Sequence, residues 1–95
     1  MKEKNKARVE IIVKGIVQGV GFRFFILRKA SELNLTGFVE NLFDGSVLIV
    51  AEGEKYLLEE LIDFAKIGPR YADVSFCDFV FKKYKNEFNS FEVRY

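Results

Sequence analysis

Residues 37–52 read GFVENLFDGSVLIVAE, and this stretch decides the predicted fold. Two short strand-like runs, 37–41 and 46–52, flank the dipeptide Asp44-Gly45. Tight hairpin turns favour this dipeptide because it tolerates a positive φ. The stretch therefore predicts an antiparallel hairpin. The fold class follows from this hairpin together with the elements predicted before and after it.

A helix is predicted on each side of the hairpin. Apolar residues in 22–33 recur at the three- and four-residue spacings of a helix that buries one face, and Asn34 is a suitable C-terminal stop. This first apolar stripe consists of Phe22, Ile26, Ala30 and Leu33. Residues 54–66 form the second helix, which Gly68-Pro69 ends. Its apolar face carries Leu58, Leu61, Ile62 and Ala65.

Three further strands complete the pattern. Residues 8–14 are rich in β-branched side chains and predict a first strand. Residues 72–82 are strand-like, with an imperfect alternation of apolar and polar residues that indicates a bulge or burial on both faces. Residues 91–95 are expected to form a short last strand. The order βαββαβ with a terminal strand predicts an α+β, ferredoxin-like sandwich, with an antiparallel sheet and both helices on one face.

Length and composition favour a single compact domain. The chain has 95 residues, of which 49% are hydrophobic, and its eleven phenylalanines predict an aromatic core. We therefore assign residues 1–95 to one domain and expect residues 1–7, where lysines cluster, to be a flexible N-terminal lead. The chain's own terminal strand and short ends favour a free-standing protein, and we expect it to be monomeric.

Charge and residue usage exclude several classes of function. A net charge of +1 provides no global field for nucleic acid or an anionic membrane, and Cys77, as the single cysteine, predicts a reducing, cytoplasmic location. The chain has no histidine. A zinc or copper site and every Ser-His-Asp or Cys-His arrangement are thereby disfavoured, so we predict no metal and no cofactor.

The segment KGIVQGVGFR, residues 14–23, joins the first strand to the first helix. Glycines in such a turn allow backbone N–H groups to converge at a helix N-terminus, which is a ready site for phosphate. Arg23 would add a bidentate contact to an anion. From spacing alone, a plain connection with a surface arginine remains the more frequent alternative, and the segment matches neither a Walker motif nor the dinucleotide fingerprint.

Two stretches, GIVQGVGFR at 15–23 and GFVENLFDGSVLIVAEG at 37–53, resemble the acylphosphatase family, and the similarity extends over about 9–95. Members hydrolyse the carboxyl–phosphate bond of acyl phosphates on a ferredoxin-like fold. The resemblance implies that Arg23 binds the substrate phosphate and that Asn41 orients the attacking water. It also implies phosphate-binding backbone N–H groups in the loop of Gln18, Gly19, Val20, Gly21 and Phe22.

This chemistry suits a chain without histidine. Phosphoryl transfer depends mainly on positioning and electrostatic stabilisation, and the carboxylate of an acyl phosphate leaves without needing a proton. The phosphate itself is then a plausible acceptor for the proton of the attacking water. The predicted partner is therefore a small acyl phosphate, with no nucleic acid and no membrane involved.

Some positions and some rival functions stay open. Phe24 and Phe25 either line the acyl side of the site or belong to the core, and Glu40 is expected on the opposite sheet face from Asn41. The rivals are a non-catalytic phosphate-binding or regulatory module, an RNA-binding sandwich, and a domain of a larger enzyme that handles carbamoyl phosphate.

Overall fold

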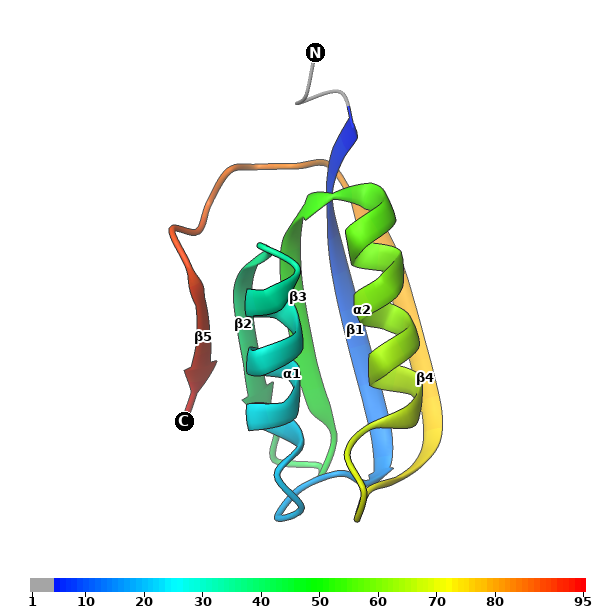
Figure 1. The fold of residues 1–95 in the computed structure, drawn as a ribbon. Helices are drawn as coiled ribbons and strands as arrows, with labels where there is room; N and C mark the ends of the chain where they lie inside the picture. Colours follow the sequence, from blue (N-terminus) through cyan, green and yellow to red (C-terminus); the bar gives the residue numbers. More distant parts are fainter. Residues whose placement is uncertain (1–4) are drawn as a thin grey trace.

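A computed structural model describes residues 5–95 as a five-stranded sheet covered by two helices on one face (Figure 1). The order of the strands in the sheet is β4-β1-β3-β2-β5. The elements are β1 (Lys6–Ile16), α1 (Phe22–Glu32), β2 (Thr36–Asn41), β3 (Val47–Glu54), α2 (Lys55–Ile67), β4 (Asp73–Lys82) and β5 (Phe91–Arg94). Within residues 5–95, neither helix is long and apolar enough to cross a membrane.

The predicted ferredoxin-like α+β fold is confirmed, with the hairpin of β2 and β3 between the two helices. Of the two alternatives for the fourth strand, a bulge or burial on both faces, the structure shows an irregularity of the bulge type, because the pairing of β1 with β4 shifts register between Lys14 and Gly15. The apolar stripe of α1 packs as predicted, with Phe22, Ile26 and Ala30 buried.

The prediction of an antiparallel sheet is wrong for one strand. β5 pairs with β2 in parallel, from Gly37 opposite Phe91 to Glu40 opposite Arg94, so the sheet is mixed. The cause is the path of the chain after β4, which leaves one edge of the sheet, crosses it as a long connection and enters the other edge in the direction of β2 (Figure 1). β5 therefore ends at the same end of the sheet as β2.

Two carboxylates and one arginine hold this crossover in place. Glu52 is buried, with its side chain 0% exposed, and its two carboxylate oxygens accept hydrogen bonds from the backbone N–H groups of Lys85 (2.8 Å) and Glu87 (2.9 Å). Arg8 contacts Glu52 at 3.3 Å and Glu87 at 2.7 Å. Hydrogen bonds to a buried charged group are among the stronger ones, so this cluster determines where the crossover meets the sheet.

The expected flexible lead of residues 1–7 is too long. Lys6 and Ala7 belong to β1, where they pair with Glu54 and Gly53 of β3. This pairing provides the backbone hydrogen bonds that a terminal segment needs in order to be ordered. Residues 1–4 of the predicted lead lie outside the described residues.

The prediction of an aromatic core is also wrong, because the centre of the sandwich is mostly aliphatic. Of the eleven phenylalanines, all of which the structure describes, Phe22, Phe38 and Phe91 are buried, and Phe38 lies outside the main core cluster. The other eight are half-buried or exposed. Valine, isoleucine and leucine fill the space between sheet and helices, as suits β-branched residues on a pleated surface.

Candidate active site

The loop between β1 and α1 has the backbone conformation of an anion cradle. Gly19 has φ 75° and Gly21 has φ 80°, both in the left-handed region that favours glycine. A Cβ atom at either position would meet no heavy atom within 4 Å. The glycines are therefore required by backbone conformation and not by crowding, and the space in front of the loop is open.

The start of α1 adds unpaired N–H groups to this loop. Gly21 occupies the N-cap position, and no side chain caps the helix. The first hydrogen bond of the helical turn runs from Phe25 N–H to the Gly21 carbonyl oxygen at 3.0 Å. The N–H groups just before Phe25 are therefore free to donate elsewhere, and the positive end of the helix dipole lies behind them.

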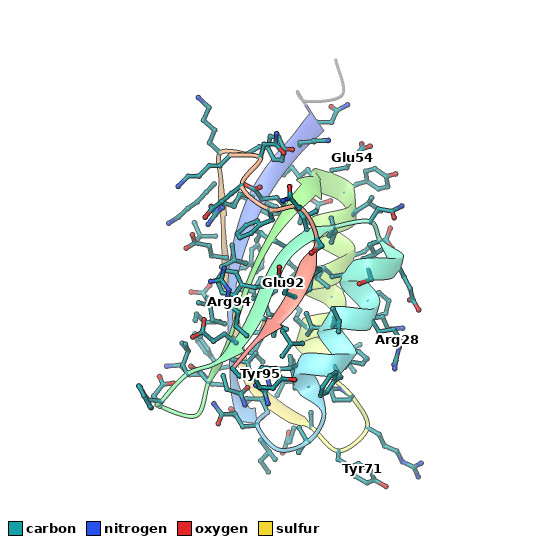
Figure 2. The ribbon with its side chains drawn as sticks, turned by 90° about the vertical axis from the view of Figure 1, so that its left-hand side faces the viewer. Arg28, Glu54, Tyr71, Glu92, Arg94 and Tyr95 are labelled. Carbon is teal, nitrogen blue, oxygen red and sulfur yellow. The ribbon has the colours of Figure 1, made fainter. Side chains whose placement is uncertain are left out.

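Arg23 is half-buried in the first turn of α1, and the end of the chain holds its side chain. Its Nη1 donates to the backbone carbonyl of Arg94 at 3.3 Å, and its guanidinium carbon lies 4.7 Å from the centroid of the Tyr95 ring. Figure 2 shows Tyr95 at the end of β5, beside the start of α1. The sequence did not reveal these contacts, because they depend on the parallel direction of β5.

Asn41 is the last residue of β2, and the structure brings it to the same hollow as Arg23 and the loop. This hollow has a volume of about 100 Å³ and is lined by Val17, Gly19, Gly21, Phe22, Arg23, Phe24 and Asn41. The Asn41 Oδ1 atom is buried and has no hydrogen-bond partner among the described residues. Such an atom is costly unless it has a partner in the working state, which makes it a candidate acceptor for a bound water.

Gln18 holds the loop to the turn that follows Asn41. Its Nε2 donates to the carbonyl oxygens of Leu42 at 2.8 Å and Ser46 at 2.9 Å. Sequence reasoning assigned Gln18 a backbone contact to phosphate and did not foresee this role for its side chain. The two bonds connect the cradle to the strand end that carries Asn41.

The turn itself is braced from within. Asp44 accepts hydrogen bonds from the hydroxyl and the backbone N–H of Ser46, and these bonds lower the pKa of the Asp44 carboxyl from its ordinary value. Backbone bonds join Leu42 N–H to Ser46 O (2.9 Å) and Gly45 N–H to Leu42 O (3.1 Å). Gly45 has φ 93°, as the predicted Asp44-Gly45 turn requires.

We expect Gln18→Ala to lower the rate of a reaction at this hollow about tenfold. Without the Gln18 side chain the loop and Asn41 are held less firmly relative to each other, and a small misplacement of reacting groups is costly. The free energy of unfolding should fall by about 1–2 kcal/mol, since two hydrogen bonds are lost. Steady-state kinetics and urea unfolding measure the two effects. Unchanged turnover in a folded variant would show that the brace has no part in activity.

A second hollow of about 400 Å³ adjoins the first, and Asn41 lines both. Its other lining residues are Gln18, Glu40, Leu42, Phe43 and Tyr95. Glu40 and Asn41 point to opposite sheet faces in an alternating strand, yet both border this hollow because it lies at the end of β2. Glu40 is therefore close to the site, although alternation places it on the opposite sheet face from Asn41.

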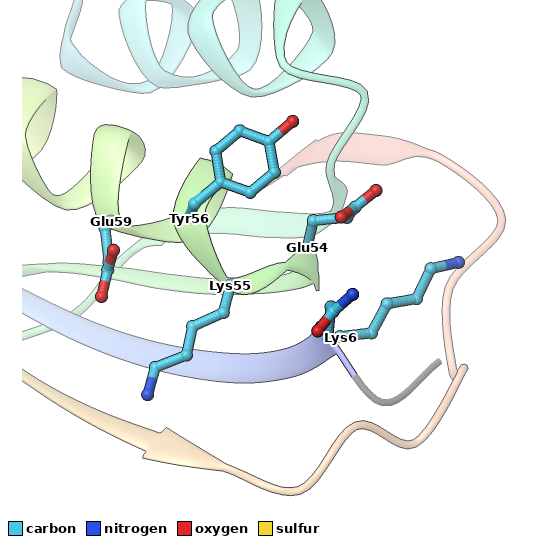
Figure 3. Close-up of a pocket in the computed structure, with 6 residues that line it drawn as sticks. Lys6, Glu54, Lys55, Tyr56 and Glu59 are labelled. Carbon is cyan, nitrogen blue, oxygen red and sulfur yellow. The ribbon is translucent and has the colours of Figure 1, made fainter. Parts of the chain in front are cut away.

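The largest hollows lie at the other end of the sheet. One of about 480 Å³ is shown in Figure 3, where Lys6, Lys55, Glu54 and Glu59 surround it with charges of both signs. It lies at the N-terminus of α2, where Glu54 is the N-cap residue, but no glycine lines it and the carboxylates of Glu54 and Glu59 disfavour an anion there. Within residues 5–95, no three Asp, Glu or Cys side chains form a group that can hold a metal ion.

The chain is similar to known proteins over most of its length. A family model described as Acylphosphatase matches residues 9–93 of the chain. A protein of Caldivirga maquilingensis named Acylphosphatase is 52% identical over 89 residues, which cover 93% of this chain and 94% of that protein.

Solved structures give the same result. An acylphosphatase from Coxiella burnetii superposes with a TM-score of 0.93 at 39% identity, covering 99% of this chain and 98% of that one. Full-length HypF, in a phosphate- and nucleotide-bound form, superposes with a TM-score of 0.85 at 31% identity, over 94% of this chain and 12% of HypF. The chain therefore belongs to the acylphosphatase family, the hydrolases that act on acyl phosphates.

Proposed function

We propose that the chain hydrolyses small acyl phosphates at the hollow between the glycine loop, Arg23 and Asn41. The observation that carries the proposal is that these three features line one hollow, in which the buried Asn41 Oδ1 atom has no partner among the described residues. The N–H groups of residues 18–22 and the Arg23 guanidinium bind the phosphate oxygens. Asn41 holds the attacking water.

The reaction is an in-line displacement at phosphorus. A bond forms between the water oxygen and phosphorus, and the bond between phosphorus and the acyl oxygen breaks, with its electron pair leaving on the carboxylate. Negative charge spreads over the equatorial phosphate oxygens in the transition state. Fixed N–H dipoles and the Arg23 charge stabilise that charge because they are already oriented toward it.

Proton transfer requires no side chain of this protein. The departing carboxylate leaves as an anion, and the proton of the attacking water passes to a phosphate oxygen. The products are a carboxylate and inorganic phosphate. We propose that this proceeds without a metal, because Arg23 and the helix N-terminus already supply positive charge at the phosphate.

The test is hydrolysis of benzoyl phosphate in the presence of a chelator, with phenyl phosphate as the control substrate. We expect benzoyl phosphate to be hydrolysed at the same rate with and without EDTA. Phenyl phosphate should be hydrolysed far more slowly, because its leaving group is a phenolate. The pKa of a phenol is about 10, as for the tyrosine side chain, whereas that of a carboxylic acid is about 4, so carboxylate leaves more easily.

Two outcomes would contradict the proposal. Loss of activity with EDTA and its recovery on adding a divalent cation would show a metal-dependent reaction. Phosphate binding without hydrolysis of any acyl phosphate would favour the non-catalytic module. A monomeric state, a cytoplasmic location and the absence of nucleic-acid or membrane partners stay predictions.

A further inference from the structure

Phe24 is an exposed aromatic residue at the edge of the phosphate hollow. Its side chain is 57% exposed, although the residues on either side of it are half-buried. At 3.6 residues per turn, position 24 is rotated by about 200° from both Phe22 and Ile26, which form the buried stripe of α1. Phe24 therefore does not serve the core.

The other aromatic residues of this helix are engaged elsewhere. The Phe25 ring lies 6.3 Å from those of Phe22 and Phe64, and Lys29 lies over it at 5.7 Å. Among the described residues, Phe24 takes part in no such ring–ring or cation–ring contact. Of the two phenylalanines that the sequence left open, Phe25 packs against the core and Phe24 borders the hollow.

In-line displacement determines which side of the phosphate the acyl group occupies. The attacking water and the leaving oxygen lie on opposite sides of phosphorus. With the water at Asn41, the acyl group leaves on the side away from Asn41. Among the described residues that line the hollow, the apolar side chains are those of Val17, Phe22 and Phe24. Val17 and Phe22 are buried in the core, so Phe24 is the exposed apolar side chain that an acyl group can contact.

We propose that Phe24 is the acyl-binding residue and that it makes the enzyme prefer acyl phosphates with an aromatic or large apolar acyl group. The inference rests on the proposed roles of Arg23 and Asn41. A planar acyl group extending from the bound phosphate packs against the Phe24 ring, which buries apolar surface and adds an aromatic contact. A small acyl group such as acetyl does not reach far enough to benefit.

The experiment compares benzoyl phosphate with acetyl phosphate in the parent protein and in Phe24→Ala. We expect the ratio of their kcat/KM values to fall about fivefold in Phe24→Ala, since aromatic contacts contribute differences of this order. The change should come from a higher KM for benzoyl phosphate. Acetyl phosphate hydrolysis should change less than benzoyl phosphate hydrolysis, because the acetyl group does not reach the Phe24 ring. An exposed helix position tolerates alanine well.

Phe43→Ala is the matched control, because Phe43 is an exposed phenylalanine that lines the second hollow and not the hollow that Phe24 lines. It should leave the ratio unchanged. An unchanged kcat/KM ratio in Phe24→Ala, or a fall of this ratio in Phe43→Ala instead, would overturn the assignment of Phe24 to the acyl group. The proposed function would still stand in that case, as long as the protein hydrolyses acetyl phosphate. Failure of the parent protein to hydrolyse either substrate would overturn the proposed function itself.

Discussion

Arg23→Ala is expected to lower kcat/KM for an acyl phosphate about a hundredfold, through a higher KM. The parent side chain offers a planar pair of donors in a half-buried position, and the loss of one such electrostatic contact costs about 3 kcal/mol. The Ki of inorganic phosphate should rise in parallel, because the same contact holds the product. Steady-state kinetics with phosphate as a competitive inhibitor measure both.

Two variants make the Arg23 result specific. Arg23→Lys keeps the charge but loses the planar fork, so we expect it to recover only part of the lost affinity. Arg28→Ala removes a charge from the same helix at a position that points away from the sheet (Figure 2), and its kinetics should match those of the parent protein. Equal losses in Arg28→Ala and Arg23→Ala would reduce the role of Arg23 to general electrostatic attraction.

The helices and the central hairpin were predictable because their signals are local. The three- and four-residue spacing of the apolar stripe in α1 and the Asp44-Gly45 turn are properties of a few neighbouring residues. The direction of β5, by contrast, has no local signal in the sequence. It follows from the path of the crossover, which the contacts of Arg8 with Glu52 and Glu87 hold, and these residues lie far apart in sequence.

The same distinction holds for the candidate site. The glycine loop and Arg23 form one continuous segment, so their common place at a helix N-terminus was predictable, and the family resemblance identified Asn41. The side-chain role of Gln18 was not predictable, because its partners Leu42 and Ser46 are more than twenty residues away and belong to a turn of irregular backbone. The support of Arg23 by Tyr95 depends in turn on the direction of β5.

Asn41→Ala is expected to lower kcat about a hundredfold while KM changes little. The proposed role of the side chain is to hold the water, which matters for the transition state, whereas Arg23 and the loop still hold the phosphate. Loss of a single well-placed polar group at such a site costs about 10²-fold or more in kcat. Asn89→Ala, a change at an exposed asparagine in the crossover, should leave kcat unaltered.

The stability of Asn41→Ala separates a role in catalysis from a role in folding. In the described structure the buried Oδ1 atom has no partner, and an unsatisfied buried polar atom costs about 1–3 kcal/mol of folding free energy. Removing it should therefore leave the free energy of unfolding unchanged or raise it, even as turnover falls. Such a gain is typical of residues that are kept for activity at the expense of stability. A variant that lost stability and turnover together would instead place Asn41 among the residues that hold the end of β2 in shape.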